Sequence, residues 1–172
     1  LGPESISLMR VALFSWETSH SIRIGGVAVH ATELASALER KGHEVHVFTR
    51  MGRDDHSAYE RIYGVHYHRC PFGTNPDFVE EMNNMCRSFV NAFFATEDYI
   101  GPFDIIHAHD WLTANALVWI KESRGRKAVF TLHSTEYGRC GNNFFNGNSE
   151  AIRHLEWLGA YRADHVIAVS KS

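Results

Sequence analysis

The sequence predicts an α/β fold in which helices cover both faces of a doubly wound, mainly parallel sheet. Short apolar runs alternate with amphipathic segments along the chain, and turn residues such as the Gly101–Pro102 pair separate them. Strands that alternate with helices favour right-handed crossovers, which place successive strands parallel in one sheet. With 172 residues, the chain is large enough for one core and short for two domains.

The first half of the chain contains three predicted strands and two predicted helices. Residues 10–15 form a buried strand, residues 44–49 a second, and residues 65–69 a third whose period-two alternation is typical of a sheet edge. A helix that ends at Gly42 follows the first strand, and a longer amphipathic helix follows the third. The apolar faces of these helices consist of Val27, Ala31, Leu34, Ala35 and Leu38, and of Phe78, Met82, Met85, Phe89 and Phe93.

The second half continues the alternation. Its predicted strands span residues 104–108, 128–132 and 164–169, and its predicted helices span residues 114–124 and 151–161. The stretch 138–149 is rich in Gly and Asn and is predicted to be irregular. This order describes one Rossmann-like domain over residues 9–172. Met9 is the expected natural start, and residues 1–8 are expected to be an expression remnant or a disordered lead.

Composition excludes several classes of function. No apolar stretch approaches the roughly 20 residues of a membrane span, and 44% hydrophobic with 22% charged residues fits a soluble globular protein. The net charge of −3 comes without a Lys or Arg cluster, so nucleic acid is not an expected partner. Cys70, Cys86 and Cys140 are odd in number and lack CxxC spacing, which argues against a disulfide framework or a zinc knuckle. We therefore expect a reduced, cytoplasmic setting.

A glycine pair, Gly25–Gly26, lies between the first strand and the first helix. Backbone N–H groups at a helix N-terminus favour an anion, so a phosphate is one expected ligand of this loop. The alternative is a tight turn that needs glycine dihedral angles. The loop lacks the GxGxxG pattern, and no acidic residue ends the second strand at residues 48–50, which argues against a nicotinamide dehydrogenase.

Polar residues gather where two later strands end. His107, His109 and Asp110 end one apolar run, and His133 ends the next. Ligands of open α/β sheets bind outside the carboxyl ends of the strands, so these positions indicate a site. In an extended strand His107 and His109 point to the same side of the sheet.

The same residues also have simpler interpretations. Asp110 can serve as an N-cap for the segment that begins at Trp111. The His107, His109 and Asp110 run resembles a metal site, yet the chain offers no further ligands in recognised spacing, so hydrogen-bonding histidines are expected and no metal is. His133 can be a satisfied polar group, but its place beside the second polar strand end favours a functional role.

Six segments, in order, carry a family resemblance. They are residues 10–15, 25–27, 41–45, 104–111, 129–133 and 163–170, and they extend from Arg10 to the end of the chain. In this order the segments resemble the N-terminal domain of retaining GT-B glycosyltransferases, a large family that includes glycogen synthase-like, sucrose-phosphate synthase-like and mannosyltransferase enzymes.

The resemblance implies half of a GT-B fold: residues 9–172 are the acceptor-side domain, and the C-terminal donor domain is absent, so this half alone is expected to be inactive. The implied reaction moves a sugar, with retention, from a nucleotide-diphosphate sugar to a glycan or small hydroxyl acceptor, with a lean toward glycogen-like synthesis. No cofactor and no metal are expected. The implied site residues are His133 and Asp110 for catalysis, Gly25 and Gly26 for the donor diphosphate, and His109, Trp111 and Glu136 for the acceptor or sugar.

Three other functions stay open from the sequence. Asp110 and Glu136 are the two carboxylates that a glycoside hydrolase would need. A non-catalytic module that binds a sugar nucleotide or phosphate is a second alternative, and an epimerase with the GT-B fold is a third. The run Ser134–Thr135–Glu136 departs from what many glycogen synthases carry, so the sugar and the acceptor stay undetermined.

Overall fold

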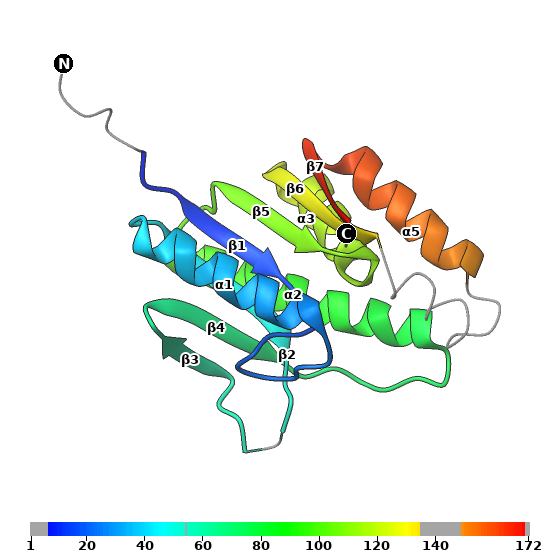
Figure 1. Ribbon diagram of the computed structural model, residues 1–172, viewed down its shortest axis with the longest axis horizontal. Coiled ribbons are helices and arrows are strands. Elements are labelled where there is room, and N and C mark those ends of the chain that lie inside the picture. The colour runs from blue at the N-terminus through cyan, green and yellow to red at the C-terminus, as the bar shows by residue number, and fades with distance from the viewer. Residues whose placement is uncertain (1–6, 54, 135–148, 171–172) are drawn as a thin grey trace.

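A computed structural model describes residues 7–53, 55–134 and 149–170, and it confirms the predicted fold class. One sheet of seven strands has the order β3-β4-β2-β1-β5-β6-β7, and all pairs except β3 with β4 are parallel (Figure 1). The strands are β1 (Arg10–Phe14), β2 (Glu44–Arg50), β3 (Tyr59–Ile62), β4 (Val65–Cys70), β5 (Ile105–His109), β6 (Lys127–Ser134) and β7 (His165–Ser170). The helices are α1 (Gly26–Arg40), α2 (Phe78–Ile100), the short 3-10 helix η1 (Trp111–Thr113), α3 (Ala114–Arg124) and α5 (Ser149–Arg162).

The sheet has an apolar layer on each face. On β1, Val11 and Leu13 belong to a small cluster with Ala35 of α1, whereas Ala12 and Phe14 belong to a larger cluster with α2 and α3. This alternation follows from the two-residue period of a strand. Helices on both faces explain why β1 is apolar on both sides from Val11 to Phe14, as is typical of a parallel sheet.

Glycines end the first two helices as the sequence predicted. Gly42 has φ +97° after α1, and its N–H donates to the carbonyl of Glu39 at 2.8 Å. Gly101, with φ +109°, does the same for Glu97 at the end of α2. L-residues adopt such φ values rarely, so a glycine after the last turn stops a helix sharply.

The edge of the sheet differs from the sequence prediction. Residues 65–69 were expected at the edge, but β3 pairs antiparallel outside β4 and takes that place. Tyr63 and Gly64 join the two strands with φ +48° and +81°, a two-residue turn of the kind that tight hairpins use. The prediction was wrong because β3 is only four residues long, carries Glu60 and Arg61, and is mostly exposed.

A buried acid ties three elements together at the amino end of the central strands. The Glu97 side chain of α2 is 3% exposed and accepts hydrogen bonds from Arg124 at 2.8 Å and from Arg126 at 2.9 Å. It also accepts the Phe103 N–H at 2.9 Å. Both carboxylate oxygens of Glu97 therefore accept hydrogen bonds, as a buried carboxylate requires.

Two further observations bear on the setting of the protein. Among the helices that the structure describes, none is both long and apolar enough to cross a membrane. Cys70 and Cys86 are buried free thiols, and burial raises the pKa of each to about 12. Cys140 lies outside the described residues.

Candidate functional site

The direction in which successive strands are added to the sheet reverses between β1 and β5. From β1 the order runs outward through β2 and β4, and from β5 it runs the other way through β6 and β7. Such a reversal leaves a crevice beyond the carboxyl ends of the two central strands, and open α/β sheets bind ligands there. The loop after β1 and Asp110 after β5 border this crevice. We therefore take this edge as the candidate site.

The N-terminus of α1 opens toward the crevice without a capping side chain. Gly25 is the N-cap and makes no side-chain cap hydrogen bond, and the first turn contains no acidic residue. Gly25 is extended at φ −150°, so no left-handed glycine conformation is needed there. A Cβ added to Gly26 would meet nothing within 4 Å. The tight-turn alternative is therefore not supported, and the open space at Gly26 leaves room for a ligand close to the backbone.

Glu17 holds the loop that precedes this helix. Its Oε2 accepts the N–H of Ile24 at 2.5 Å and of Gly25 at 2.8 Å, and the residue is fully buried. The N–H of Gly25 therefore has a protein partner, whereas the N–H groups of the first turn, from Gly26 on, have no acceptor within the helix. The sequence analysis missed Glu17, although it is the only acid between the first strand and the glycine pair.

Four histidines gather above the carboxyl ends of β5 and β6; we call His30, His107, His109 and His133 the histidine cluster. The rings of His107 and His109 stack at 4.3 Å between centroids, which confirms that they share one side of the sheet. The ring of His30, from α1, lies edge-on at 5.9 Å from His109 and 5.4 Å from His133. His30 was not predicted, but its place four residues after Gly26 was a usable signal, because one helical turn separates the two.

Burial keeps His107 and His109 of the histidine cluster neutral near pH 7. Burial lowers the pKa of His107 to about 4 and that of His109 well below its usual range, and the neighbouring histidines lower both further. Burial and then His30 lower the pKa of His133 as well. Neutral imidazoles act as hydrogen-bond donors or acceptors, and His107 does so through Nε2 to the Thr131 hydroxyl at 2.6 Å.

His109 contributes two ring nitrogens without a hydrogen-bond partner in the described part of the chain, and it is 1% exposed. Ring nitrogens of His30, His109 and His133 lie within 4.8 Å of one another, a spacing that can hold a metal ion. Within the residues that the structure describes, Asp110 does not belong to that group. The converging set therefore differs from the His107, His109 and Asp110 run considered from the sequence.

Asp110 caps the segment after β5, as predicted. Its Oδ1 accepts the N–H of Trp111 at 2.9 Å, and its backbone has φ +67° and ψ 169°, a region that residues other than glycine rarely adopt. The carboxyl group is 3% exposed, and within residues 7–53, 55–134 and 149–170 its Oδ2 has no hydrogen-bond partner. Burial, with a smaller contribution from the charges of Glu156 and Glu17, raises the pKa of Asp110 to about 7, although the Trp111 N–H opposes the shift. This carboxyl can therefore exchange a proton near neutral pH.

The remaining predicted residues lie elsewhere. Trp111 is 1% exposed and packs in the core against Phe78, with ring centroids 6.0 Å apart. It lies beneath Asp110 rather than on the surface. Glu136 falls outside the described residues, and with it the separation between Asp110 and Glu136 that a hydrolase would fix.

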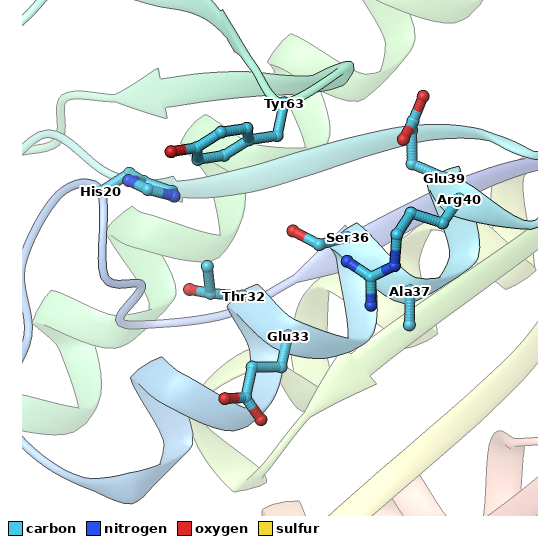
Figure 2. A pocket seen from close by; sticks show the side chains of 8 residues that line it. All are labelled: His20, Thr32, Glu33, Ser36, Ala37, Glu39, Arg40 and Tyr63. Carbon is cyan, nitrogen blue, oxygen red and sulfur yellow. The ribbon is translucent and has the colours of Figure 1, made fainter.

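A separate hollow lies along α1. This open groove has a volume of about 1000 Å³. Figure 2 shows that its lining residues come from α1, the loop after β1 and the β3–β4 turn. It is lined by His20, Thr32, Glu33, Ser36, Ala37, Glu39, Arg40 and Tyr63. None of the residues predicted from the sequence for the site lines it, so the strand-end crevice and this groove are distinct.

The mainly parallel, Rossmann-like sheet matches the fold of GT-B glycosyltransferases. The sequence profile described as Glycosyltransferase Family 4 matches residues 24–172, and the chain belongs to that family. An uncharacterized glycosyltransferase of Methanocaldococcus jannaschii is 36% identical over 164 residues, which cover 95% of this chain and 40% of that protein. A glycogen synthase of Mycobacterium tuberculosis is 29% identical and is covered to 43%. The chain thus spans about two fifths of the length of these curated relatives.

Solved structures agree on the fold. Sucrose-phosphate synthase from Thermosynechococcus elongatus superposes with a TM-score of 0.71 at 21% identity, over 92% of this chain and 41% of that one. The catalytic domain of starch synthase IV from Arabidopsis thaliana, bound to ADP and acarbose, gives a TM-score of 0.58 at 21% identity over 74% of this chain and 34% of that one.

Proposed function

We propose that this chain is the acceptor-side half of a retaining glycosyltransferase that moves a hexosyl group from a nucleotide-diphosphate sugar to a glycan or other hydroxyl acceptor. One observation carries the proposal: the uncapped N-terminus of α1 and the histidine cluster meet in one crevice, because His30 on α1 contacts both His109 and His133. An anion site next to neutral hydrogen-bonding rings suits a sugar diphosphate, which is charged at one end and polar at the other.

The Gly25–Gly26 loop receives the donor diphosphate. The free N–H groups at Gly26 and beyond point to the ligand, and the helix dipole favours the negative charge that grows on the leaving group. Donors that strengthen as charge develops lower the barrier more than they tighten ground-state binding. Because these groups supply the stabilisation, the transfer needs no metal or other cofactor.

Asp110 and His133 face the transferred sugar and the acceptor. His133 hydrogen-bonds the sugar near the reacting carbon. Asp110 uses Oδ1 to cap Trp111, and its Oδ2 accepts a hydrogen bond from a sugar hydroxyl. His109 forms the neutral floor of the sugar subsite. Trp111 supports Asp110 from the core, so its role is positioning rather than contact. Glu136 remains a proposed acceptor contact.

The similarity to a glycogen synthase favours a glucan as acceptor, and a glycogen synthase-like reaction is our preferred form of the proposal. We place the protein in the cytoplasm, since Cys70 and Cys86 are free thiols, which persist in reducing compartments.

A direct test uses the two-domain protein of which this chain is the N-terminal part. The protein is incubated with a panel of nucleotide-sugars and glucan or small hydroxyl acceptors, with and without a chelator, and the anomeric configuration of the product is read by NMR. We expect transfer with retention that the chelator leaves unchanged, and no transfer by the 172-residue chain alone. Inverted products, or a strict need for metal, would refute the mechanism. Binding of donors without any transfer would favour the non-catalytic module.

A further inference from the structure

A second group of metal-ligating side chains lies at the opposite, amino-terminal part of the sheet. Glu44 begins β2, and His46 and His66 face each other across the β2–β4 pair. The ligand atoms of these three residues lie within 4.8 Å of one another. They border a cavity of about 410 Å³ between the sheet edge and the last turns of α2. We call these three residues the β2–β4 site.

The ring nitrogen of His46 that faces Glu44 has no hydrogen-bond partner in the described chain. This atom, Nε2, lies 3.8 Å from Oε1 of Glu44, beyond hydrogen-bonding distance, and the His46 side chain is only 4% exposed. A buried polar atom without a partner is energetically unfavourable, so such atoms call for an explanation. An ion bound between Nε2 and the carboxylate supplies one.

The other nitrogens of both histidines are already held by protein groups. Nδ1 of His46 bonds to Nε2 of His68 at 2.9 Å, and Nδ1 of His66 bonds to the Tyr59 hydroxyl at 2.5 Å. Metal-bound histidines in proteins usually have their second nitrogen held in this way, which fixes the tautomer and the ring orientation. Nε2 is thus the nitrogen that each ring offers to an ion.

The carboxylate also suits a cation. The Arg10 side chain bonds to Oε2 of Glu44, which leaves Oε1 directed at His46. Arg10 and Arg61 also repel a cation, which limits the affinity.

One adjustment is needed on binding. The rings of His46 and His66 are stacked, 6° from parallel with centroids 4.2 Å apart, and an ion binds in the plane of an imidazole. One ring must therefore rotate about its Cβ–Cγ bond to share an ion with the other. His66 is half-buried and borders the cavity, and its partner Tyr59 is 48% exposed, so both have room to move.

We propose that Glu44, His46 and His66 bind a divalent transition-metal ion of the Zn²⁺ type that joins β2 to β4. Two imidazoles and one carboxylate are a donor set that Zn²⁺ accepts, whereas Mg²⁺ and Ca²⁺ prefer all-oxygen sites. The site lies at the strand ends opposite to the proposed sugar site, so it stabilises the sheet edge and takes no part in transfer. The proposal is therefore independent of the proposed function.

The test measures Zn²⁺ bound to the chelator-treated chain by equilibrium dialysis, together with its melting temperature. At Zn²⁺ concentrations about 100 times the dissociation constant, we expect a rise of roughly 5–10 °C. His66→Gln should lose one equivalent of Zn²⁺ and the rise, and Glu44→Gln should weaken binding about tenfold or more. His30→Gln is the matched control, because it removes a ligand from the other histidine group, and it should retain the site.

The outcomes separate cleanly. Loss of one Zn²⁺ equivalent in His66→Gln but not in His30→Gln supports the proposal. The reverse pattern would assign the ion to the histidine cluster and overturn it, as would a wild-type chain that binds no Zn²⁺ or a His66→Gln variant that binds as much as wild type. If His66→Gln fails to fold, Glu44→Gln decides, because this half-buried side chain lies at the start of its strand.

Discussion

Replacing Asp110 with asparagine should stabilise the chain in a pH-dependent way. The amide keeps the oxygen that accepts the Trp111 N–H, and asparagine tolerates positive φ better than most residues. The substitution therefore removes mainly the ionisation of a carboxyl group that is 3% exposed. Since the pKa of Asp110 is raised to about 7, chiefly by burial, the folded wild-type chain holds a buried charge at alkaline pH, and this charge lowers its free energy of unfolding.

The sign and the magnitude follow from linkage. Between the usual pKa of 3.8 and the raised value of about 7, the folded state binds more protons than the unfolded state, so the free energy of unfolding falls as pH rises through this window. A shift of about three units corresponds to about 4 kcal/mol in total, of which about 2–3 kcal/mol is lost between pH 5 and pH 8. Asp110→Asn does not lose this stability, because its amide does not ionise.

Urea unfolding of both chains at pH 5, 6, 7 and 8 measures the difference. We expect the stability of Asp110→Asn relative to wild type to grow by about 2–3 kcal/mol across this range, and the histidines common to both chains cancel. Asp77→Asn is the matched control, because Asp77 is an exposed N-cap whose side chain accepts the Val79 N–H at 3.0 Å. A difference at Asp110 that stays flat with pH would refute the reasoning. In the two-domain protein the same variant should be slower, since stability and function oppose each other at such sites.

Three further predictions concern the site and the packing around it. Gly26→Ala should raise the free energy of unfolding by about 0.5–1 kcal/mol, because the new Cβ meets nothing, and should lower kcat/KM of the two-domain protein about tenfold or more by blocking the diphosphate; a stabilised, fully active variant would contradict this. His133→Ala should lower kcat by about 10²-fold or more with little change in donor affinity, and near-normal kcat in steady-state assays would exclude the catalytic role. Glu97→Ala should lower the free energy of unfolding by about 3 kcal/mol in urea titrations, because it leaves Arg126 and the Phe103 N–H without this acceptor and leaves Arg124 with Asp98 alone; a loss below about 1 kcal/mol would show that solvent replaces these bonds.

Sequence periodicity predicted the central architecture because burial on both faces leaves a strong apolar signal. All six strands and four helices expected from the pattern are present, and Gly42 ends α1 as predicted. The hairpin strand β3 was missed because its residues are exposed, so their polarity carries no burial signal. The Glu97 network was also missed. Its arginines are 27 and 29 residues away, and only the packing of α2 against α3 and β6 brings them together.

Sequence patterns indicated where the candidate site lies better than they indicated which residues belong to it. The strand-end rule needs only the strand boundaries, and it predicted that polar side chains after β5 and β6 lie close together; the rings of His107, His109 and His133 do so. His30 joins them through the path of α1 over the sheet, which the sequence does not give. No sequence pattern indicated the β2–β4 site, for the same reason. His46 and His66 are 20 residues apart and become neighbours only through strand pairing.

Locally unfavourable features concentrate at the strand-end crevice, and this supports a function there independently of any resemblance. Tyr63 also has a positive φ, but the hairpin turn that it forms explains it. Asp110 has no such turn, and it combines a glycine-like backbone with a buried carboxyl. Gly26 weakens the start of a helix where an alanine would fit, and His109 buries two ring nitrogens that no group in the described chain satisfies. Local rules can fail together at one place when a ligand supplies the missing partners, and this agrees with our proposal that the sugar diphosphate binds in the crevice between β1 and β5.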